Sequence, residues 1–409
     1  MSTSPKSDFD PDATIISVLT DRAAIADPYP RYLALRENAP IHKTALAKMW
    51  IVSCYDDARA VLRDPRCGNP SPEMFEQGRA GIDGSMRRAR SRESLSILQL
   101  NPPDHGRIRG LVARAFTPRR VEKLRPEVEA IADQLLDAMG GSGDFVSGLA
   151  FPLPANVISA LVGVPEEDRE FLRPLIGDLT VGIEPSASDD EIAQADAAGA
   201  TMREYLVDLI AARRADPGDD LLSVLIYANE DGDQLTENEI LINTLLIYAA
   251  GFETTTHLIG NMFRAFVANP TQLDRVRADR SLIPGAVEEV LRYDPPVQLD
   301  GRYLHESMEL GGHVIEQGDS IITLIGAVNR DPVHFENPDV FDVGRTETQT
   351  LSFGSGIHYC LGAALARLEG QVVLGKLLDR YETWEIVGEP TWRPRITLRG
   401  VEYMEVSLS

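Results

Sequence analysis

The longest stretch of helical hydrophobic periodicity in the chain runs from Thr236 to Asn269. Thr236 and Glu239 form a T-x-x-E capping box, which marks a helix start, and Pro270 cannot continue a helix beyond Asn269. A helix of more than thirty residues is at least about 45 Å long. Residues 240–250 are apolar on nearly every face, so we expect this helix to be buried at the centre of the fold.

Shorter segments with helical periodicity predict further helices, and short β-branched runs predict strands. Capping residues and prolines separate these segments. The helices are expected over 27–38, 56–63, 121–139, 153–162, 165–179, 188–214, 284–293 and 361–381. The strands are expected near residue 41 and over 49–53, 313–315, 320–324, 384–386, 395–398 and 401–407. This order predicts a mainly α fold with small β-sheets.

Length and composition indicate one large globular unit. The chain has 409 residues, 43% of them hydrophobic, and no repeat or low-complexity linker divides it. We expect a single domain over 1–409, with an N-terminal segment over 1–26. No run approaches the roughly 18 apolar residues of a membrane span, and three scattered cysteines offer no disulfide framework. We therefore expect a cytoplasmic monomer with no membrane segment.

Charge narrows the range of partners. Forty basic and sixty-three acidic residues give a formal net charge of −23, so nucleic acids and anionic membranes are repelled on average. Residues 101–125 oppose this trend, with seven arginines and lysines against Asp104 and Glu122. Such local positive charge favours docking of an acidic protein. A solvated basic helix and loop is the alternative.

One cysteine lies where a glycine-rich loop meets the start of an apolar helix, in the stretch 353–362, F-G-S-G-I-H-Y-C-L-G. Backbone N–H groups at a helix start favour the thiolate of Cys360, and glycines let a large flat ligand approach the backbone. Cys360 is therefore a candidate metal ligand. The alternatives are an inert buried cysteine and a zinc site. Zinc prefers four ligands, but the only other cysteines are Cys54 and Cys67, and no C-x-x-C pair exists.

The stretch 250–256, A-G-F-E-T-T-T, interrupts the apolar pattern of the central helix. Gly251, Glu253 and three threonines are poor choices for a core helix, and local rules broken at one place point to function. Glycine and hydroxyls that bond preceding carbonyls predict an opening of the helix at Gly251, with room for a small ligand. The alternative is a threonine-lined kink without chemistry.

Two further pairs of charged residues and two loops carry weaker signals. His105 and Arg109 are four residues apart after paired prolines, so one helix face can grip an anion. Glu289 and Arg292 form an i,i+3 pair, which contributes roughly 0–1 kcal/mol if it is exposed. The irregular stretch 68–100 contains an arginine cluster at 87–92, and residues 180–187 are expected to form a mobile lid over a pocket.

Together these motifs resemble those of the cytochrome P450 family, from about residue 27 to the end of the chain. The loop around Cys360 is similar to the family's haem-binding loop, A-G-F-E-T to its oxygen-binding segment, and E-x-x-R to a structural ion pair. The resemblance implies the P450 fold, with haem b between the central helix and the cysteine-loop helix and with Cys360 bound to iron as a thiolate. A proline common in one turn of the family is Glu316 here, which predicts a changed turn.

The resemblance also implies roles for individual residues. The catalytic residues would be Thr254 and Glu253, which relay protons. The haem propionates would be held by His105, Arg109, Arg302 and His358. The structural ion pairs beside the haem loop would be formed by Glu289, Arg292 and Arg345. The substrate pocket would be bordered by Ala249, Ala250, Val297, Gln298, Ile396 and Thr397.

The implied function is that of a haem-thiolate monooxygenase, which inserts one atom of O2 into a C–H bond by hydroxylation or epoxidation. Its small lipophilic substrate is not named by the sequence, since fatty acids, terpenes, steroids and polyketides all fit. Electrons would come from NAD(P)H through a ferredoxin reductase and a ferredoxin. The ferredoxin would dock on the face that carries Arg107, Arg114, Arg119 and Arg120.

Two alternatives stay open within this resemblance. A peroxygenase of the same fold would use hydrogen peroxide directly and would have little need of Glu253 and Thr254. A non-catalytic haem sensor would leave the predicted proton relay without a purpose.

Overall fold

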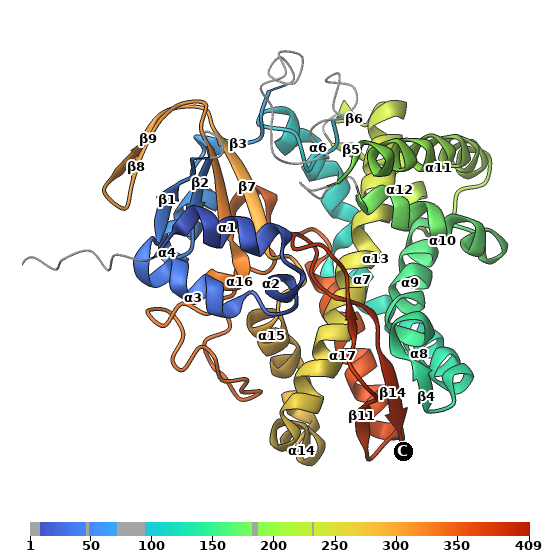
Figure 1. The fold of residues 1–409 in the computed structure, drawn as a ribbon. Helices are drawn as coiled ribbons and strands as arrows, with labels where there is room; N and C mark the ends of the chain where they lie inside the picture. The colour runs from blue at the N-terminus through green and yellow to red at the C-terminus, as the bar shows by residue number, and fades with distance from the viewer. Residues whose placement is uncertain (1–8, 46–48, 72–94, 182–186, 231–232) are drawn as a thin grey trace, which may run out of the picture.

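The computed structural model describes residues 9–45, 49–71, 95–181, 187–230 and 233–409. Helix α13, Glu237–Ala268, runs through the middle of the molecule, and α17, Ala363–Arg380, packs against it (Figure 1). The predicted capping box is present, because Thr236 Oγ1 accepts from the Glu239 amide at 3.2 Å and Glu239 Oε2 accepts from the Thr236 amide at 2.8 Å. Most residues of α13 are buried, as the apolar pattern predicts.

The other helices surround α13. It contacts α9, α10, α11, α15 and α17. The helices before it are α1 Pro11–Thr20, α2 Arg22–Ala26, α3 Tyr29–Asn38, α4 Tyr55–Arg63, α6 Asp104–Ala113, α7 Pro118–Lys123, α8 Arg125–Met139, α9 Pro152–Val162, α10 Glu166–Val181, α11 Asp189–Ala215 and α12 Leu221–Tyr227. Those after it are α14 Pro270–Ala278, α15 Ile283–Tyr293, α16 Ile325–Val328 and α17. Single helical turns are η2 Arg114–Phe116, η3 Val146–Ala150, η4 Arg280–Leu282 and η5 Gly356–His358.

The strands form small sheets at the edges of the helical body (Figure 1). The five-stranded sheet has the order β1-β2-β10-β7-β3, in which β10 is parallel to β2 and the other pairs are antiparallel. Its strands are β1 Ile41–Lys43, β2 Met49–Val52, β3 Cys67–Gly68, β7 Leu299–Leu304 and β10 Ser320–Leu324. A three-stranded sheet joins β11 Trp384–Ile386, β14 Glu405–Leu408 and β4 Ser142–Asp144. The paired strands are β5 Asn229–Glu230 with β6 Asp233–Gln234, β8 Met308–Leu310 with β9 His313–Ile315, and β12 Thr391–Trp392 with β13 Val401–Tyr403.

This architecture confirms the predicted mainly α fold, with three local differences. The helix expected over 121–139 is divided into α7 and α8, because Pro126 starts a new helix in its first turn. The strand expected over 395–398 is wrong, since only Leu398 forms a single bridge, to Val297. Helix α13 continues through Gly251 without a break, although the hydroxyls of Thr254, Thr255 and Thr256 do bond the preceding carbonyls as predicted. A Cβ at Gly251 would lie 2.7 Å from Ile158 Cδ1 on α9, so close helix packing requires the glycine.

The remaining predictions concern two loops and one turn. The predicted lid over 180–187 lies mostly outside the described residues, as does the whole arginine cluster at 87–92. The turn that contains Glu316 is described, and the Asp319 amide closes it by donating to the Glu316 carbonyl at 3.0 Å. Gly318 follows Glu316 with a φ of 91°, a left-handed conformation that favours glycine.

Three charged residues lie together beneath the cysteine loop. Glu289 on α15 accepts from Arg292 Nε at 2.7 Å and from Arg345 Nε at 3.1 Å. Arg292 also donates to the carbonyl oxygens of Asn329 and Pro338, so both ends of the pair are satisfied. Arg292 and Glu289 are fully buried, and removal of one partner from such a pair costs about 3–5 kcal/mol. The pairs thus fasten α15 to the segment that precedes the cysteine loop.

Among the described helices, none is by itself both long and apolar enough to cross a bilayer. Val146–Val162 and Glu166–Val181 meet that test only when taken together, and they are bent by 119° where they meet.

Candidate functional site

Two glycines of the 353–362 loop occupy positions where a larger residue would not fit or would be strained. Gly354 and Gly356 adopt positive φ values of 69° and 71°. A Cβ at Gly356 would also lie 2.5 Å from the Leu62 carbonyl oxygen, so the loop passes directly against α4. The Cys360 amide donates to the Phe353 carbonyl at 2.9 Å and closes the loop. These constraints hold Cys360 just before the start of α17.

Opposing effects act on the ionisation of the Cys360 thiol. Burial raises the pKa of the Cys360 thiol, whereas the backbone N–H groups of Gly362 and Ala363 and the charges of Arg109 and Arg367 lower it. The residue still has an accessible surface, so protein crowds the sulfur without covering it. A bound metal cation would overcome the cost of burial, because a coordinating thiol is deprotonated.

The surroundings of Cys360 do not favour a metal held by protein ligands alone. Among the residues that the structure describes, no three or more His, Cys, Asp and Glu side chains are grouped so that they could hold a metal ion. Cys54 and Cys67 are likewise not paired with Cys360 or with each other. A structural zinc site needs four ligands, so this donor set instead fits a metal that brings most of its ligands with it.

Four nitrogen-donor side chains from three parts of the chain meet near this loop. His105 and Arg109 come from α6, His358 from η5 and Arg302 from β7. The His105 and His358 rings are 4.3 Å apart between centroids. Arg302 pairs with Asp300, and Arg109 donates to the Tyr359 carbonyl. The structure therefore brings together all four residues expected to hold propionates.

This cluster has unmet capacity to donate hydrogen bonds to an anion. His105 is 2% exposed, and within the described part of the chain its Nε2 atom has no hydrogen-bond partner. Burial, followed by the charge of Arg109, lowers the pKa of His105 to about 4. Burial, followed by Arg302, His105 and Arg109, lowers the pKa of His358 to about 3. The arginines of the cluster therefore make protonation of the two histidines unfavourable. A bound anion would offset this repulsion between positive charges.

One stripe of the central helix is accessible beside this site. Ala250 is exposed and Thr254 is half-buried, whereas Phe252, Glu253 and Thr255 are buried. Positions 250 and 254 lie one turn apart on the same helix face. The Thr254 hydroxyl donates to the Ala250 carbonyl at 3.1 Å. Accessible surface at two positions one turn apart on a mostly buried helix indicates a face that meets a ligand rather than a core.

Glu253 points to a different environment from Thr254. It is 3% exposed, and one carboxylate oxygen, Oε1, forms an ion pair with Arg393 and lies 3.7 Å from His257 Nε2. Within the described residues, the other oxygen, Oε2, has no hydrogen-bond partner. Sequence analysis missed both neighbours. His257 had a local signal, since it is one turn after Glu253, but Arg393 had none.

The structure divides the residues expected to border the substrate pocket. Ala249, Ala250, Val297 and Thr397 retain accessible surface. Gln298 is fully buried and donates to the Pro295 carbonyl at 2.7 Å, and Ile396 packs in the core beside the N-terminal helices. Neighbouring residues of an extended segment point in opposite directions, which explains why Val297 and Gln298 separate.

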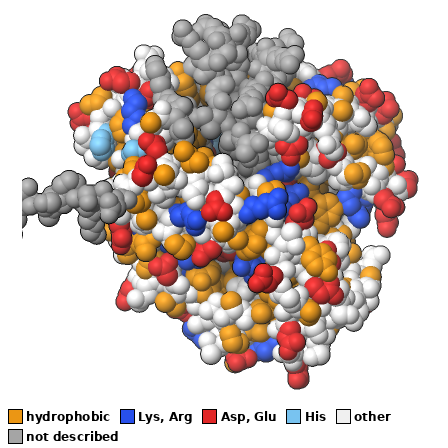
Figure 2. All heavy atoms as spheres, viewed as in Figure 1, with side chains coloured by type: hydrophobic (Ala, Val, Ile, Leu, Met, Phe, Trp, Pro, Cys, Tyr) orange, Lys and Arg blue, Asp and Glu red, His pale blue; other side chains and the backbone are white. Residues whose placement is uncertain are grey.

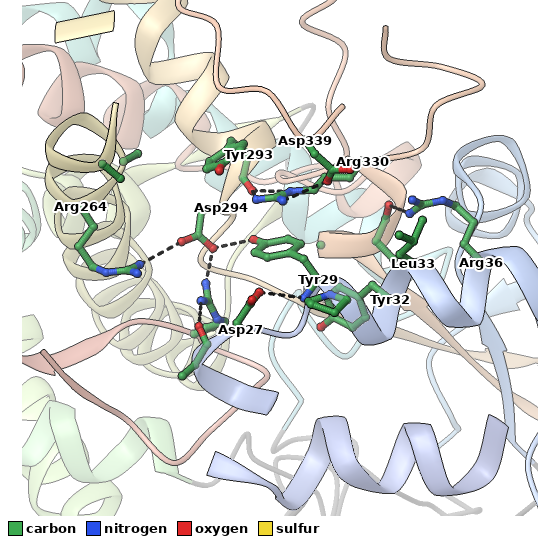
Figure 3. Close-up of a pocket in the computed structure, with 17 residues that line it drawn as sticks. Asp27, Tyr29, Tyr32, Leu33, Arg36, Arg264, Tyr293, Asp294, Arg330 and Asp339 are labelled. Atoms are coloured by element: carbon green, nitrogen blue, oxygen red, sulfur yellow. Dashed lines mark hydrogen bonds and ion pairs between the residues drawn. The ribbon is translucent and has the colours of Figure 1, made fainter. Parts of the chain in front are cut away.

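A hollow of about 560 Å³ lies between α3, α13, α15 and α16 and includes no residue of the cysteine loop (Figure 3). Asp294 at its centre accepts from the Tyr29 hydroxyl at 2.6 Å, pairs with Arg264 at 3.4 Å and also pairs with Arg399. Arg330 stacks on the Tyr29 ring at 3.4 Å. The central charges of the hollow are therefore already paired. These contacts hold the N-terminal helices against the core, and we do not assign the hollow to a ligand.

Comparisons with known proteins agree with this geometry. The family model described as Cytochrome P450 matches residues 192–398. The chain is 41% identical to Cytochrome P450 107B1 of Saccharopolyspora erythraea, over 94% of this chain and 96% of that protein. It is 36% identical to Polyketide biosynthesis cytochrome P450 PksS of Bacillus subtilis, over 94% of this chain and 96% of that protein. The crystal structure of P450BioI with an acyl carrier protein superposes with a TM-score of 0.87 at 34% identity, covering 95% of this chain and 99% of that one.

The histidine cluster leads to a pH prediction. Arg109→Gln removes a charge that lowers the pKa of both His105 and His358, so both values should rise toward the ordinary 6.5. The imidazole resonances of the ligand-free protein, followed by NMR as the pH falls, report each value. Since the folded-state pKa values lie below the unfolded value, the wild-type protein should lose stability as the pH falls from about 6.5 to about 3, and the variant should lose less from these two groups.

The matched control for this measurement is Arg22→Gln, which removes an exposed arginine from α2. It should leave both imidazole titrations where the wild-type protein has them. Titrations of His105 and His358 that do not move in Arg109→Gln would contradict the electrostatic account of the cluster.

Proposed function

The chain belongs to the cytochrome P450 family, and we propose that it hydroxylates or epoxidises a small lipophilic substrate with electrons from NAD(P)H delivered through a ferredoxin. Proteins of this family are oxidoreductases that incorporate oxygen, and they bind haem b through a cysteine thiolate. The observation that carries the proposal is the position of Cys360, held accessible at the helix start by a loop with two left-handed glycines.

The residues present fit a haem. Cys360 would ligate the iron, and His105, Arg109, Arg302 and His358 would bind its two propionates. The support for this assignment is the buried, unpartnered Nε2 of His105 within a group of donors. When bound, haem supplies the reductive activation of dioxygen, from which one atom enters the substrate and the other leaves as water.

The chain's own part in the chemistry begins with the sulfur. The amides of Gly362 and Ala363 and the charges of Arg109 and Arg367 favour its anionic form. Arg367 is itself held by Glu288 at 3.1 Å and stacks over the Phe353 ring at 4.4 Å. These contacts fix a positive charge near the sulfur.

Protons are the second requirement, because the oxygen that leaves as water takes up two of them. Thr254 donates to the Ala250 carbonyl, and a hydroxyl that donates once still accepts hydrogen bonds from water. A hydroxyl is a poor acid, so Thr254 would hold a water molecule at the accessible stripe. Glu253, the adjacent carboxylate, would pass protons to that water from outside as a general acid–base group. A peroxygenase would have little use for this pair.

We propose a polyketide-type substrate, since one of the relatives, PksS, is named for polyketide biosynthesis. The small side chains of Ala249 and Ala250 on α13 leave the accessible stripe open to a bulky ligand. A polyketide would then meet the helix at the same face that presents Thr254.

We propose that the electron donor docks beside the cysteine loop, although part of the expected basic face is neutralised within the chain. Arg107 pairs with Glu239, and Arg120 pairs with Asp219 at 3.1 Å. Arg119 on α7 is exposed, and Ile357 and Tyr359 of the loop are 47% and 41% exposed. The face in Figure 2 carries scattered acidic side chains, with lysines and arginines gathered near its middle, so positive charge is local on this face.

A substrate has to be identified first. A library of polyketides, steroids and fatty acids is screened for a blue shift of the main haem absorption band, which polyketides should give most strongly.

The first experiment on the proton relay then compares Thr254→Ala with Glu253→Gln. With that substrate, Thr254→Ala should still consume NADPH and oxygen but divert much of the flux to hydrogen peroxide. Glu253→Gln should slow oxygen consumption itself, by roughly 10²–10⁴-fold. Wild-type turnover and wild-type product per NADPH in both variants would contradict the proton relay.

The second experiment concerns docking. Electron transfer from a ferredoxin should slow as salt rises, because exposed charges are screened beyond about 8–10 Å at 0.1–0.15 M. Arg119→Glu should slow it further at low salt, by stopped-flow measurement of haem reduction. The control, Arg22→Glu, reverses an equally exposed charge on α2 and should have little effect. A rate that depends on neither salt nor Arg119 would rule out this docking face.

A further inference from the structure

The buried carboxylate of Glu253 is anchored by a residue far away in the chain. Glu253 is itself almost fully buried on α13, and Phe252 and Thr255 on either side of it are buried as well, so its charge needs a partner. That partner is Arg393, which follows β12 and whose side chain is 25% exposed. The guanidinium group therefore reaches from the surface to a carboxylate that is almost fully buried.

The segment that carries Arg393 is fixed against α13 on several sides. The Arg393 amide donates to the Gly400 carbonyl at 3.2 Å. A Cβ at Gly400 would lie 2.0 Å from His257 Nδ1, so the backbone presses on α13 one turn after Glu253. Arg399 then ties the segment down, since its amide donates to the Pro296 carbonyl at 2.7 Å and its side chain pairs with Asp294. Arg393 thus starts from a backbone that has little freedom to move.

The ion pair uses only half of the carboxylate. Arg393 holds Oε1, and His257 Nε2 is 3.7 Å from the same oxygen. For the residues described, Oε2 is buried and without a hydrogen-bond partner. A pair formed only for stability would be expected to satisfy both oxygens, because an unmade buried hydrogen bond costs about 1–3 kcal/mol. The structure leaves Oε2 available to another proton donor or acceptor.

We infer that Arg393 is a positioning residue, which holds the Glu253 carboxylate ionised and turned so that Oε2 exchanges protons with the water chain. The inference deepens the proposed function and rests on it for the role of Glu253. Arg393 does not touch the substrate or the haem in this account. It acts through Glu253, and its partly exposed guanidinium group marks the side from which protons enter.

The test begins with a readout that does not depend on turnover. In haem-loaded Arg393→Gln, the carboxylate of Glu253 loses its cation while it stays buried, so it should take up a proton near neutral pH. Infrared spectroscopy should then show a new protonated-carboxyl band, which is lost in the double variant Arg393→Gln/Glu253→Gln. Arg393→Lys keeps the positive charge and should show little of this band.

The matched control is Arg395→Gln, which removes another arginine from the same segment. Arg395 pairs at 3.5 Å with Glu191, a residue whose side chain is 45% exposed, so its loss leaves no buried charge. It should give no new carboxyl band, and its haem content and oxygen consumption should match those of the wild-type protein. If Arg393→Gln does not fold, Arg393→Lys still tests the inference, because it keeps the positive charge beside Glu253 and should therefore keep most of the wild-type oxygen consumption; a loss of oxygen consumption as large as that of Glu253→Gln would count against the inference.

Kinetics give the second readout. Arg393→Gln should slow oxygen consumption by about 10-fold or more and change its solvent deuterium isotope effect, while Arg393→Lys recovers most of the rate. Combined with Glu253→Gln it should be no slower than Glu253→Gln alone, because both act on one carboxylate. A missing carboxyl band in folded Arg393→Gln, or losses that multiply in the double variant, would overturn the inference. Wild-type oxygen consumption in Glu253→Gln would instead refute the proton relay, and the infrared result would still judge the positioning.

Discussion

The fold is built around one demand, which is to keep a cysteine sulfur anionic inside a protein. Burial raises the pKa of the Cys360 thiol, so the charge has to be supported from several directions. Amides at the start of α17 and the guanidinium groups of Arg109 and Arg367 supply part of that support, and the metal of a haem would supply the rest. The tight glycine loop and the buried pairs of Glu289 follow from the same demand, since a displaced sulfur would lose these contacts.

The two sides of the site divide the chemical work. On the side of α17, donors and arginines are arranged for anions, which are the thiolate and the propionates. On the side of α13, an accessible stripe with Thr254 is set beside the buried carboxylate of Glu253. The α17 side needs fixed positive charges, whereas the α13 side needs a carboxylate that exchanges protons. The half-used ion pair with Arg393 fits that second need, because it fixes one oxygen and leaves the other available.

Local patterns predicted most of what is local. The capping box, the cysteine loop and the i,i+3 pair of Glu289 each lie within a few residues, and sequence spacing is enough to see them. Contacts between residues that are far apart in the chain could not be predicted from these local patterns. Gly251 was explained by an opening of the helix, yet its cause is Ile158 on another helix. Arg393 and Glu253 are far apart in the chain, and half of the predicted docking arginines meet carboxylates that no local pattern reveals. The direction of Gln298 and Ile396 was likewise undecidable without the core that receives them.

The central claim is that Cys360 ligates haem iron as a thiolate, and the absorption spectrum of the reduced protein with carbon monoxide tests it most directly. The wild-type protein should show the strongly red-shifted band of thiolate ligation. Cys360→Ala should lose that band, while Cys54→Ala, which changes a half-buried cysteine elsewhere, should keep it. A red-shifted band that persists in Cys360→Ala would contradict the account.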